Sequence, residues 1–95
     1  MGASRAIGFE ISISARDDGT LEAVYIKIAD GKVAKTKEVS TDVLLADYSA
    51  SGKLLGIEIL APVKLSKIAP LVDPPRRSSF RRLVKRAAPR ELVLA

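Results

Sequence analysis

The chain has no cysteine, no histidine and no tryptophan, and its only aromatic side chains are two Phe and two Tyr. The absence of cysteine excludes disulfides, thiolate nucleophiles and cysteine-ligated metal clusters. The absence of histidine removes the commonest transition-metal ligand and the side chain that titrates closest to neutral pH. Ser–His–Asp and Cys–His catalysis therefore cannot be built from one chain. We predict that the protein is not an enzyme and has no cofactor, although carboxylate chemistry with a hard metal ion stays open.

Long apolar runs are also missing. No segment approaches the roughly 20 apolar residues of a membrane span. The first ten residues contain no run that resembles a signal peptide, and Ala6 stands where a myristoylation signal has Ser or Thr. We therefore expect a soluble, cytoplasmic protein without a membrane span.

The length of 95 residues, with 47% hydrophobic residues, suits one globular domain. A chain of this size buries only about 60–70% of the surface that it exposes when unfolded. Its core is predicted to be modest, so association with a second copy would help to stabilise it.

Charge is distributed unevenly. Residues 1–60 contain seven basic and nine acidic residues, a net charge of −2, whereas residues 61–95 contain nine basic and two acidic residues, a net charge of +7. The total of +5 therefore arises in the C-terminal third. Such asymmetry indicates a separate interaction surface.

Five short segments are predicted to be strands, because each is apolar or alternating and is bounded by turn residues. They are residues 9–15, 22–29, 33–39, 43–48 and 54–60. Alternation places successive side chains on opposite faces, so one face collects aliphatic residues. The side chains predicted to face inward are Phe9, Ile11, Ile13, Val24, Ile26, Ile28, Leu55, Ile57 and Ile59.

Turn chemistry and polarity predict how these strands are arranged. Asp30-Gly31 favours a hairpin between the second and third strands. The charged third strand suits an edge of the sheet, where lysine discourages unwanted pairing, and the apolar fourth strand suits a central position. Gly56, inside the fifth strand, indicates a bulge or a close backbone approach.

The C-terminal third has helical patterns interrupted by proline. Leu65, Ile68 and Ala69 predict a short helix that ends at Pro70. Residues 73–75, Asp-Pro-Pro, predict a stiff break. A second helix is predicted from a cap at Ser78 or Ser79 to about Ala88, with an apolar stripe formed by Phe80, Leu83, Val84 and Ala87. Residues 91–95 are apolar again and predict a strand or a docking tail.

Five segments follow one another in a specific order: Glu22–Ile28, Asp30–Val33, Lys35–Val39, Val43–Tyr48 and Gly52–Leu60. Through this ordered set, residues 22–60 resemble a small prokaryotic family, domain of unknown function family 2283. The resemblance implies a compact β-rich module without an established activity. It also suggests an antitoxin-like or partner-binding role, and it does not extend to the basic C-terminal third.

We therefore predict an α+β or mainly-β fold, with an antiparallel meander of four to five strands followed by one or two C-terminal helices. Residues 1–61 form the predicted β module and residues 62–95 a basic helical extension. A sheet with one aliphatic face needs a cover. We expect the extension of the same chain or of a partner protomer to supply it, in a homodimer with Pro74-Pro75 as the hinge of the exchange.

Two groups of residues are candidates for function. The first is the basic cluster of the second helix, which contains Arg76, Arg77, Arg81, Arg82, Lys85 and Arg86. These side chains could contact phosphates while Phe80 stacks on a base. Alternatively, the helix docks through the predicted interface residues Phe80, Leu83 and Val84, and its arginines face solvent, a membrane surface or an acidic protein.

The second group contains Tyr25, Asp47 and Glu58, which alternation places on the polar face of the sheet. Carboxylates with separated pKa values can perform acid–base chemistry. The alternative is a solvated face with cross-strand pairs, such as Glu58 with Lys27 or Lys53. The glycines lack phosphate-loop spacing, and no metal site is predicted. Together the residues predict a non-catalytic interaction or regulatory module that binds a protein, with nucleic-acid binding through the basic helix as the alternative.

Overall fold

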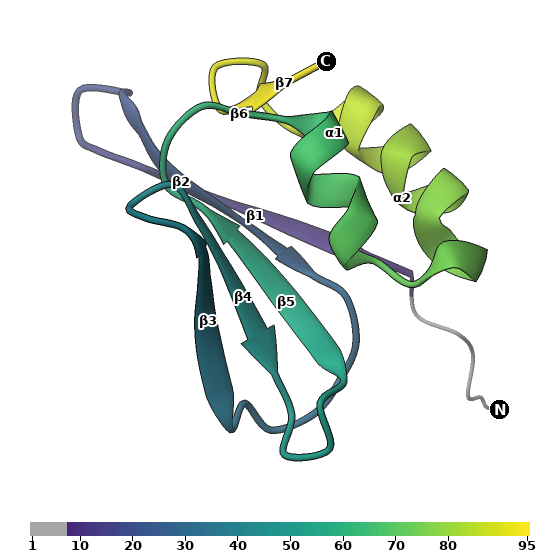
Figure 1. Cartoon of the computed structure of the whole chain (residues 1–95). Helices are drawn as coiled ribbons and strands as arrows, with labels where there is room; N and C mark the ends of the chain where they lie inside the picture. Colours follow the sequence, from purple (N-terminus) through teal and green to yellow (C-terminus); the bar gives the residue numbers. More distant parts are fainter. Residues whose placement is uncertain (1–7) are drawn as a thin grey trace, which may run out of the picture.

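The computed structural model describes residues 8–95. It shows a five-stranded antiparallel sheet with two helices packed on one of its faces (Figure 1). The predicted fold class is confirmed. Residues 1–7 lie outside the described residues, and with them the first part of the predicted β module and Ala6.

The elements follow one another in a simple order, with all five long strands before the helices. They are β1 (Glu10–Ala15), β2 (Leu21–Lys27), β3 (Lys35–Ser40), β4 (Leu44–Tyr48), β5 (Leu54–Ile59), β6 (Val63–Lys64), α1 (Leu65–Ile68), the 3₁₀ helix η1 (Ala69–Leu71), α2 (Pro74–Ala87) and β7 (Val93–Leu94). Each predicted strand is present, with ends that differ by one or two residues.

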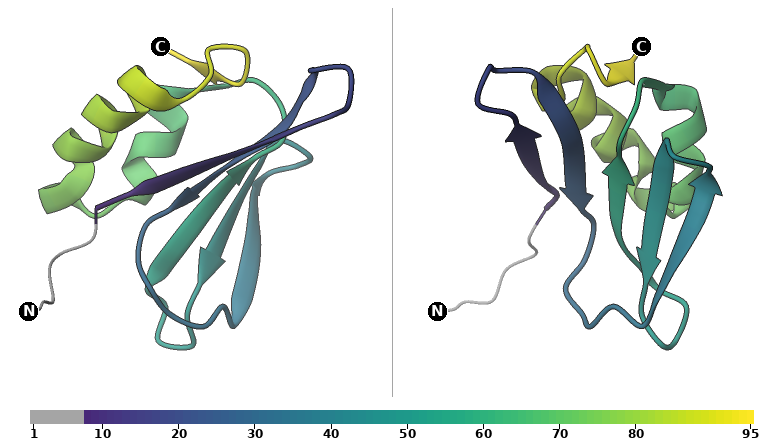
Figure 2. Two further views of the ribbon diagram at one scale, coloured as in Figure 1. Left: turned by 180° about the vertical axis from the view of Figure 1, so that it is seen from behind. Right: turned by 90° about the vertical axis from the view of Figure 1, so that its left-hand side faces the viewer.

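The order of the strands across the sheet is β1-β2-β5-β4-β3. The meander holds for β3, β4 and β5, but the hairpin predicted at Asp30-Gly31 is wrong, because β2 pairs with β5 instead of β3. Ile28 and Ala29 extend this pairing, since both donate to the carbonyl oxygen of Leu55, at 2.8 and 3.2 Å. The next residues therefore cross the end of the sheet to its far edge (Figure 2).

Polarity explains this order. All six residues of β3 are exposed, and the strand lies at an edge, as predicted. By contrast, β5 is almost wholly buried and lies in the centre, where it hydrogen-bonds to strands on both sides. β5 has a hydrogen-bonded strand along each edge and the helices over one face, and most of its side chains are accordingly apolar.

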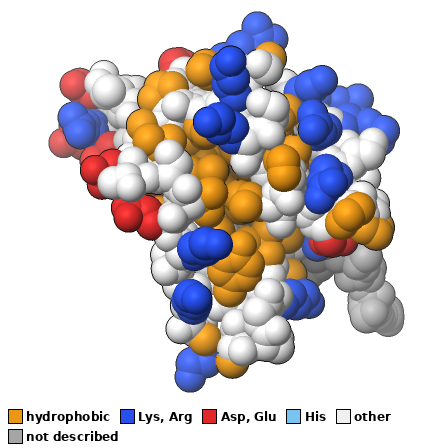
Figure 3. All heavy atoms as spheres, in the orientation of Figure 1, with side chains coloured by type: hydrophobic (Ala, Val, Ile, Leu, Met, Phe, Trp, Pro, Cys, Tyr) orange, Lys and Arg blue, Asp and Glu red, His pale blue; other side chains and the backbone are white. Residues whose placement is uncertain are grey.

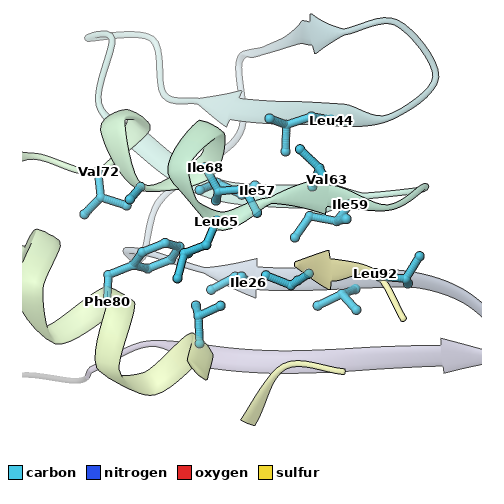
Figure 4. Close-up of a cluster of buried hydrophobic side chains, with 14 of the residues drawn as sticks. Ile26, Leu44, Ile57, Ile59, Val63, Leu65, Ile68, Val72, Phe80 and Leu92 are labelled. Atoms are coloured by element: carbon cyan, nitrogen blue, oxygen red, sulfur yellow. The ribbon is translucent and has the colours of Figure 1, made fainter. Parts of the chain in front are cut away.

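The aliphatic face of the sheet is buried against the C-terminal segment of the same chain. Figure 4 shows Ile26 and Ile57 near Ile68 and Phe80 of the helices, and Ile59 belongs to the same core. The remaining members of this core are Val24, Ile28, Leu44, Val63, Leu65, Ala69, Val72, Val84, Leu92 and Val93. Because one core includes side chains from both predicted regions, residues 62–95 are part of the fold.

Ile13 is the exception among the predicted inward residues. Its side chain is 49% exposed, whereas Ile11 on the same strand packs against the core. β1 is an edge strand, and its hairpin with β2 projects beyond the helices (Figure 1). The alternation is correct, but no element of residues 8–95 covers this end of the strand.

The second helix begins earlier than predicted, at Pro74 instead of Ser78 or Ser79. Pro74 and Pro75 occupy its first turn, where the missing N–H has no helical partner in any case and the fixed φ of proline suits a helix. The prediction of a break at these prolines is therefore wrong. The predicted use of Pro74-Pro75 as the hinge of an exchange between protomers stays a prediction, as the homodimer does.

The end of the chain is docked, as predicted. β7 pairs with β6 in a short parallel ladder, in which Val63 faces Val93. Leu92 and Val93 are buried. The chain thus covers its own aliphatic face, and the homodimer stays a prediction. No helix among residues 8–95 has the length and apolar character needed to cross a bilayer.

Phe80 provides a test of this packing. Its side chain is fully buried, so we expect Phe80→Ala to lower the free energy of unfolding by about 3–5 kcal/mol. Ile13→Ala, on the exposed end of β1, is the control and is expected to cost about 1 kcal/mol or less. Urea denaturation measures both. Equal effects would contradict a core closed by the C-terminal segment.

Candidate functional site

Arg76 and Arg77, the first two residues of the predicted basic cluster, point toward the protein itself. Arg76 donates to the carbonyl oxygen of Ile28 at 2.9 Å, and its guanidinium lies 4.5 Å from the centre of the Phe9 ring. Arg77 donates to the carbonyl oxygens of Ala69, Pro70 and Val72, at distances between 2.8 and 3.3 Å. Both side chains therefore have a structural role at the junction of the sheet and the helices.

The other four members of the cluster point outward from α2. Arg81, Arg82, Lys85 and Arg86 are all exposed. α2 contains no acidic residue, and neither of the two ion pairs among residues 8–95 involves the helix. The outward face of α2 is therefore a continuous basic surface without internal neutralisation.

The predicted interface residues line the opposite side of α2. Phe80 and Val84 are buried in the core, and Leu83 is half-buried. The Phe80 ring packs edge-to-face on Phe9, with centroids 5.3 Å apart. Phe80 is therefore unavailable for stacking on a base, and the docking alternative describes its position correctly.

The second predicted group does come together, on the face of the sheet that the helices leave open. The Tyr25 hydroxyl donates to Oδ2 of Asp47 at 3.0 Å, although these residues lie on β2 and β4, with β5 between them. The Thr36 hydroxyl, on β3, donates to Oδ1 of the same carboxylate at 2.7 Å. A row of hydrogen-bonded side chains thus extends from β2 across β5 and β4 to β3.

Gly56 makes this row possible. It faces Lys27 on β2 and Asp47 on β4 in the strand register, and the Tyr25 side chain lies across it. A Cβ atom at this position would overlap the Tyr25 hydroxyl and ring. Gly56 was predicted to mark a bulge or a close backbone approach, whereas the group that lies against it is the side chain of Tyr25.

Residues 18–61 match the model of a family of unknown function, DUF2283. The resemblance predicted for residues 22–60 is confirmed and slightly extended. The DUF2283 segment contains β2, β3, β4 and β5, and hence the complete row of Tyr25, Gly56, Asp47 and Thr36. Comparisons with curated proteins and with solved structures gave no significant match.

The remaining groups of the open face do not form the predicted ion pairs. Glu58 lies opposite Tyr25 and Leu45 in the register, whereas Lys27 pairs with Asp30 at 2.6 Å. Among residues 8–95, no three acidic side chains come together as they would to hold a metal ion. The row on Asp47 thus links side chains from β2, β4 and β3 within the DUF2283 segment.

The chemistry of the row follows from the Tyr25 phenol. Burial, the hydrogen bond to Asp47 and the charges of Asp47 and Glu58 raise the pKa of Tyr25 to about 12. A phenol with this pKa remains protonated at neutral pH, where it donates a hydrogen bond and cannot serve as a base. The row is therefore suited to holding strands together.

Thr36 and Gly56 were not predicted to be partners of Asp47. Glycine inside a strand pointed to a close approach, but the approaching group depends on strand register, which alternation leaves undefined. The unexpected pairing of β2 with β5 is what places Tyr25 beside Gly56.

A double-mutant cycle tests the fit between Tyr25 and Gly56. We expect Gly56→Ala to destabilise the protein by about 1–3 kcal/mol, because the new methyl group displaces the tyrosine. In a Tyr25→Ala background the same change is expected to be nearly neutral. Urea denaturation of the four proteins gives the coupling energy. A penalty of equal size in both backgrounds would contradict the contact.

The pKa of Tyr25 can be measured directly. Tyr48→Phe leaves Tyr25 as the only tyrosine, and we expect its absorbance titration to have a midpoint of about 12. Because the folded state raises the pKa from 10.0, the contribution to stability is complete below pH 10 and is lost as the pH rises toward 12.

The matched control for this titration adds Asp47→Asn, which removes the carboxylate that accepts the Tyr25 hydrogen bond. The midpoint should then fall part of the way toward 10, because burial, the largest cause of the raised pKa, remains. A midpoint near 10 with Asp47 intact would show that the hydrogen bond does not form.

Proposed function

We propose that this chain is a small, non-catalytic binding module that meets an acidic protein surface with the outward face of α2. The observation that carries the proposal is the exposure of Arg81, Arg82, Lys85 and Arg86 on a helix without acidic residues or ion pairs. Figure 3 shows Lys and Arg side chains on the helix-bearing side, whereas most acidic side chains in that view lie at its left edge.

The rigidity of α2 supports this role. The helix is anchored by the burial of Phe80 and Val84 and by the carbonyl hydrogen bonds of Arg77. Its outward side chains are thus presented by a fixed scaffold, which lowers the conformational cost of binding. The suggested antitoxin-like role would be one form of such partner binding.

Nucleic-acid binding is the alternative, because phosphates also suit a basic helix face. The burial of Phe80 argues against recognition of a single strand, which uses exposed aromatic side chains for stacking. A protein surface requires no such platform, since arginine forms bidentate hydrogen bonds with carboxylates.

Fluorescence anisotropy with labelled poly-glutamate and a labelled DNA duplex of similar charge tests the proposal. We expect Arg81→Gln/Arg82→Gln to weaken poly-glutamate binding about three- to tenfold, because an exposed charge pair contributes up to about 1 kcal/mol. The control Lys64→Gln/Lys67→Gln removes the same charge from exposed positions outside α2 and should have little effect.

The salt dependence separates the two functions. A duplex that binds much more tightly than poly-glutamate, with a steep loss of affinity in salt that Arg81→Gln/Arg82→Gln reduces, would establish the nucleic-acid alternative. If neither probe binds at low salt, the outward face of α2 is only a solvated surface and the proposal is wrong.

A further inference from the structure

Two hollows adjoin one another on the helix-bearing side of the molecule, around the turn between β4 and β5. The larger, of about 690 Å³, lies between this turn, η1 and the start of α2. The smaller, of about 480 Å³, lies between the turn and β3. Tyr48 and Gly52 line both hollows, so the two meet at the end of β4. These hollows are separate from the outward face of α2.

The lining of the two hollows is strongly basic. Lys35 and Lys37 line the smaller hollow, and Lys53, Arg76 and Arg77 line the larger one. Asp73 is the one acidic residue in either lining. None of the five cations belongs to an ion pair within residues 8–95. These residues are far apart in the sequence, so the fold has gathered positive charge at one place.

The two arginines are held in position before any ligand arrives. The hydrogen bonds of Arg76 to Ile28 and of Arg77 to Val72 fix both guanidiniums without neutralising them, because the acceptors are carbonyl oxygens. A guanidinium has five N–H donors, and these contacts leave some of them free. An anion would therefore bind to side chains whose rotamer entropy is already lost.

Tyr48 adds an apolar contact at the junction of the hollows. It is half-buried and is the only aromatic residue that residues 8–95 contribute to either lining. Figure 3 shows hydrophobic side chains in the middle of this side of the molecule, with Lys and Arg side chains around them. Planar rings of any base type stack on aromatic side chains. The start of α2 adds little, because Pro74 and Pro75 have no N–H.

We propose that the paired hollows bind a small phosphorylated molecule with a planar ring, of the nucleoside phosphate class. The phosphates lie against Lys53, Arg76 and Arg77, and the ring lies against Tyr48. Lys35 and Lys37 supply further positive charge beside the ring. This site uses none of the side chains of the proposed protein-binding surface, so either proposal can fail without the other.

Isothermal titration calorimetry with ADP, inorganic phosphate and adenosine tests the site, and amide NMR shifts locate it. We expect ADP to bind more tightly than either fragment and to shift residues 34–37, 48–53 and 71–77. Lys35→Gln/Lys37→Gln/Lys53→Gln should weaken ADP binding at least about tenfold, a loss of about 1.4 kcal/mol. All three lysines are exposed and unpaired among residues 8–95, so these changes should leave the fold intact.

The matched control is Arg81→Gln/Arg82→Gln/Lys85→Gln, which removes the same charge from α2 and should leave ADP affinity within about twofold. Equal weakening by both triple variants would show general attraction of anions and would overturn the site. So would the absence of ADP binding at about 1 mM.

Tyr48→Leu tests whether the site recognises the ring of a nucleoside phosphate or only a phosphate group. The variant should weaken ADP binding several-fold and leave inorganic phosphate unaffected, with an amide spectrum that verifies folding. If inorganic phosphate binds as tightly as ADP, and Tyr48→Leu changes neither, the ring has no place in the site and the assignment to nucleoside phosphates is wrong.

Discussion

The aliphatic face of the sheet packs directly against the C-terminal segment, with Ile26 and Ile57 on one side of the contact and Ile68 and Phe80 on the other. A single sheet with one exposed apolar face is not stable in water. The C-terminal segment therefore completes the core. The segment that resembles DUF2283 ends at Ala61, before the helices begin, so in this chain its sheet depends on residues that the family match does not include.

The same packing divides the basic residues of α2 into two kinds. The side of the helix that carries Phe80 and Val84 must face the sheet, and this orientation places Arg76 and Arg77 over backbone carbonyls. Arg81 and its neighbours then face solvent because they lie on the opposite side of the same helix. The basic cluster looks uniform in the sequence, but some of its arginines bind backbone carbonyl oxygens and others face solvent. The side of the helix on which each arginine lies determines which of the two it does.

The open face of the sheet is organised in another way, by hydrogen bonds in place of burial. Gly56 has no side chain, so the Tyr25 side chain can lie across the central strand β5 and donate its hydrogen bond to Asp47. With Thr36 on the same carboxylate, three strands are linked across a fourth. The raised pKa of the phenol keeps the donor in place at neutral pH. On this face, which no helix covers, side-chain hydrogen bonds hold the strands together.

The sequence by itself determined the location of the five strands of the main sheet, the alternation of their faces, the edge position of the charged β3 and the amphipathic character of α2. These properties are local, because they follow from the spacing of side chains along one element. The partner of β2, the row on Asp47 and the basic hollows around Tyr48 were decided by the tertiary structure. They depend on strand register and on contacts between distant residues, which local spacing does not encode. The start of α2 at Pro74 lies between these cases, because proline either breaks a helix or begins one according to its position in the turn.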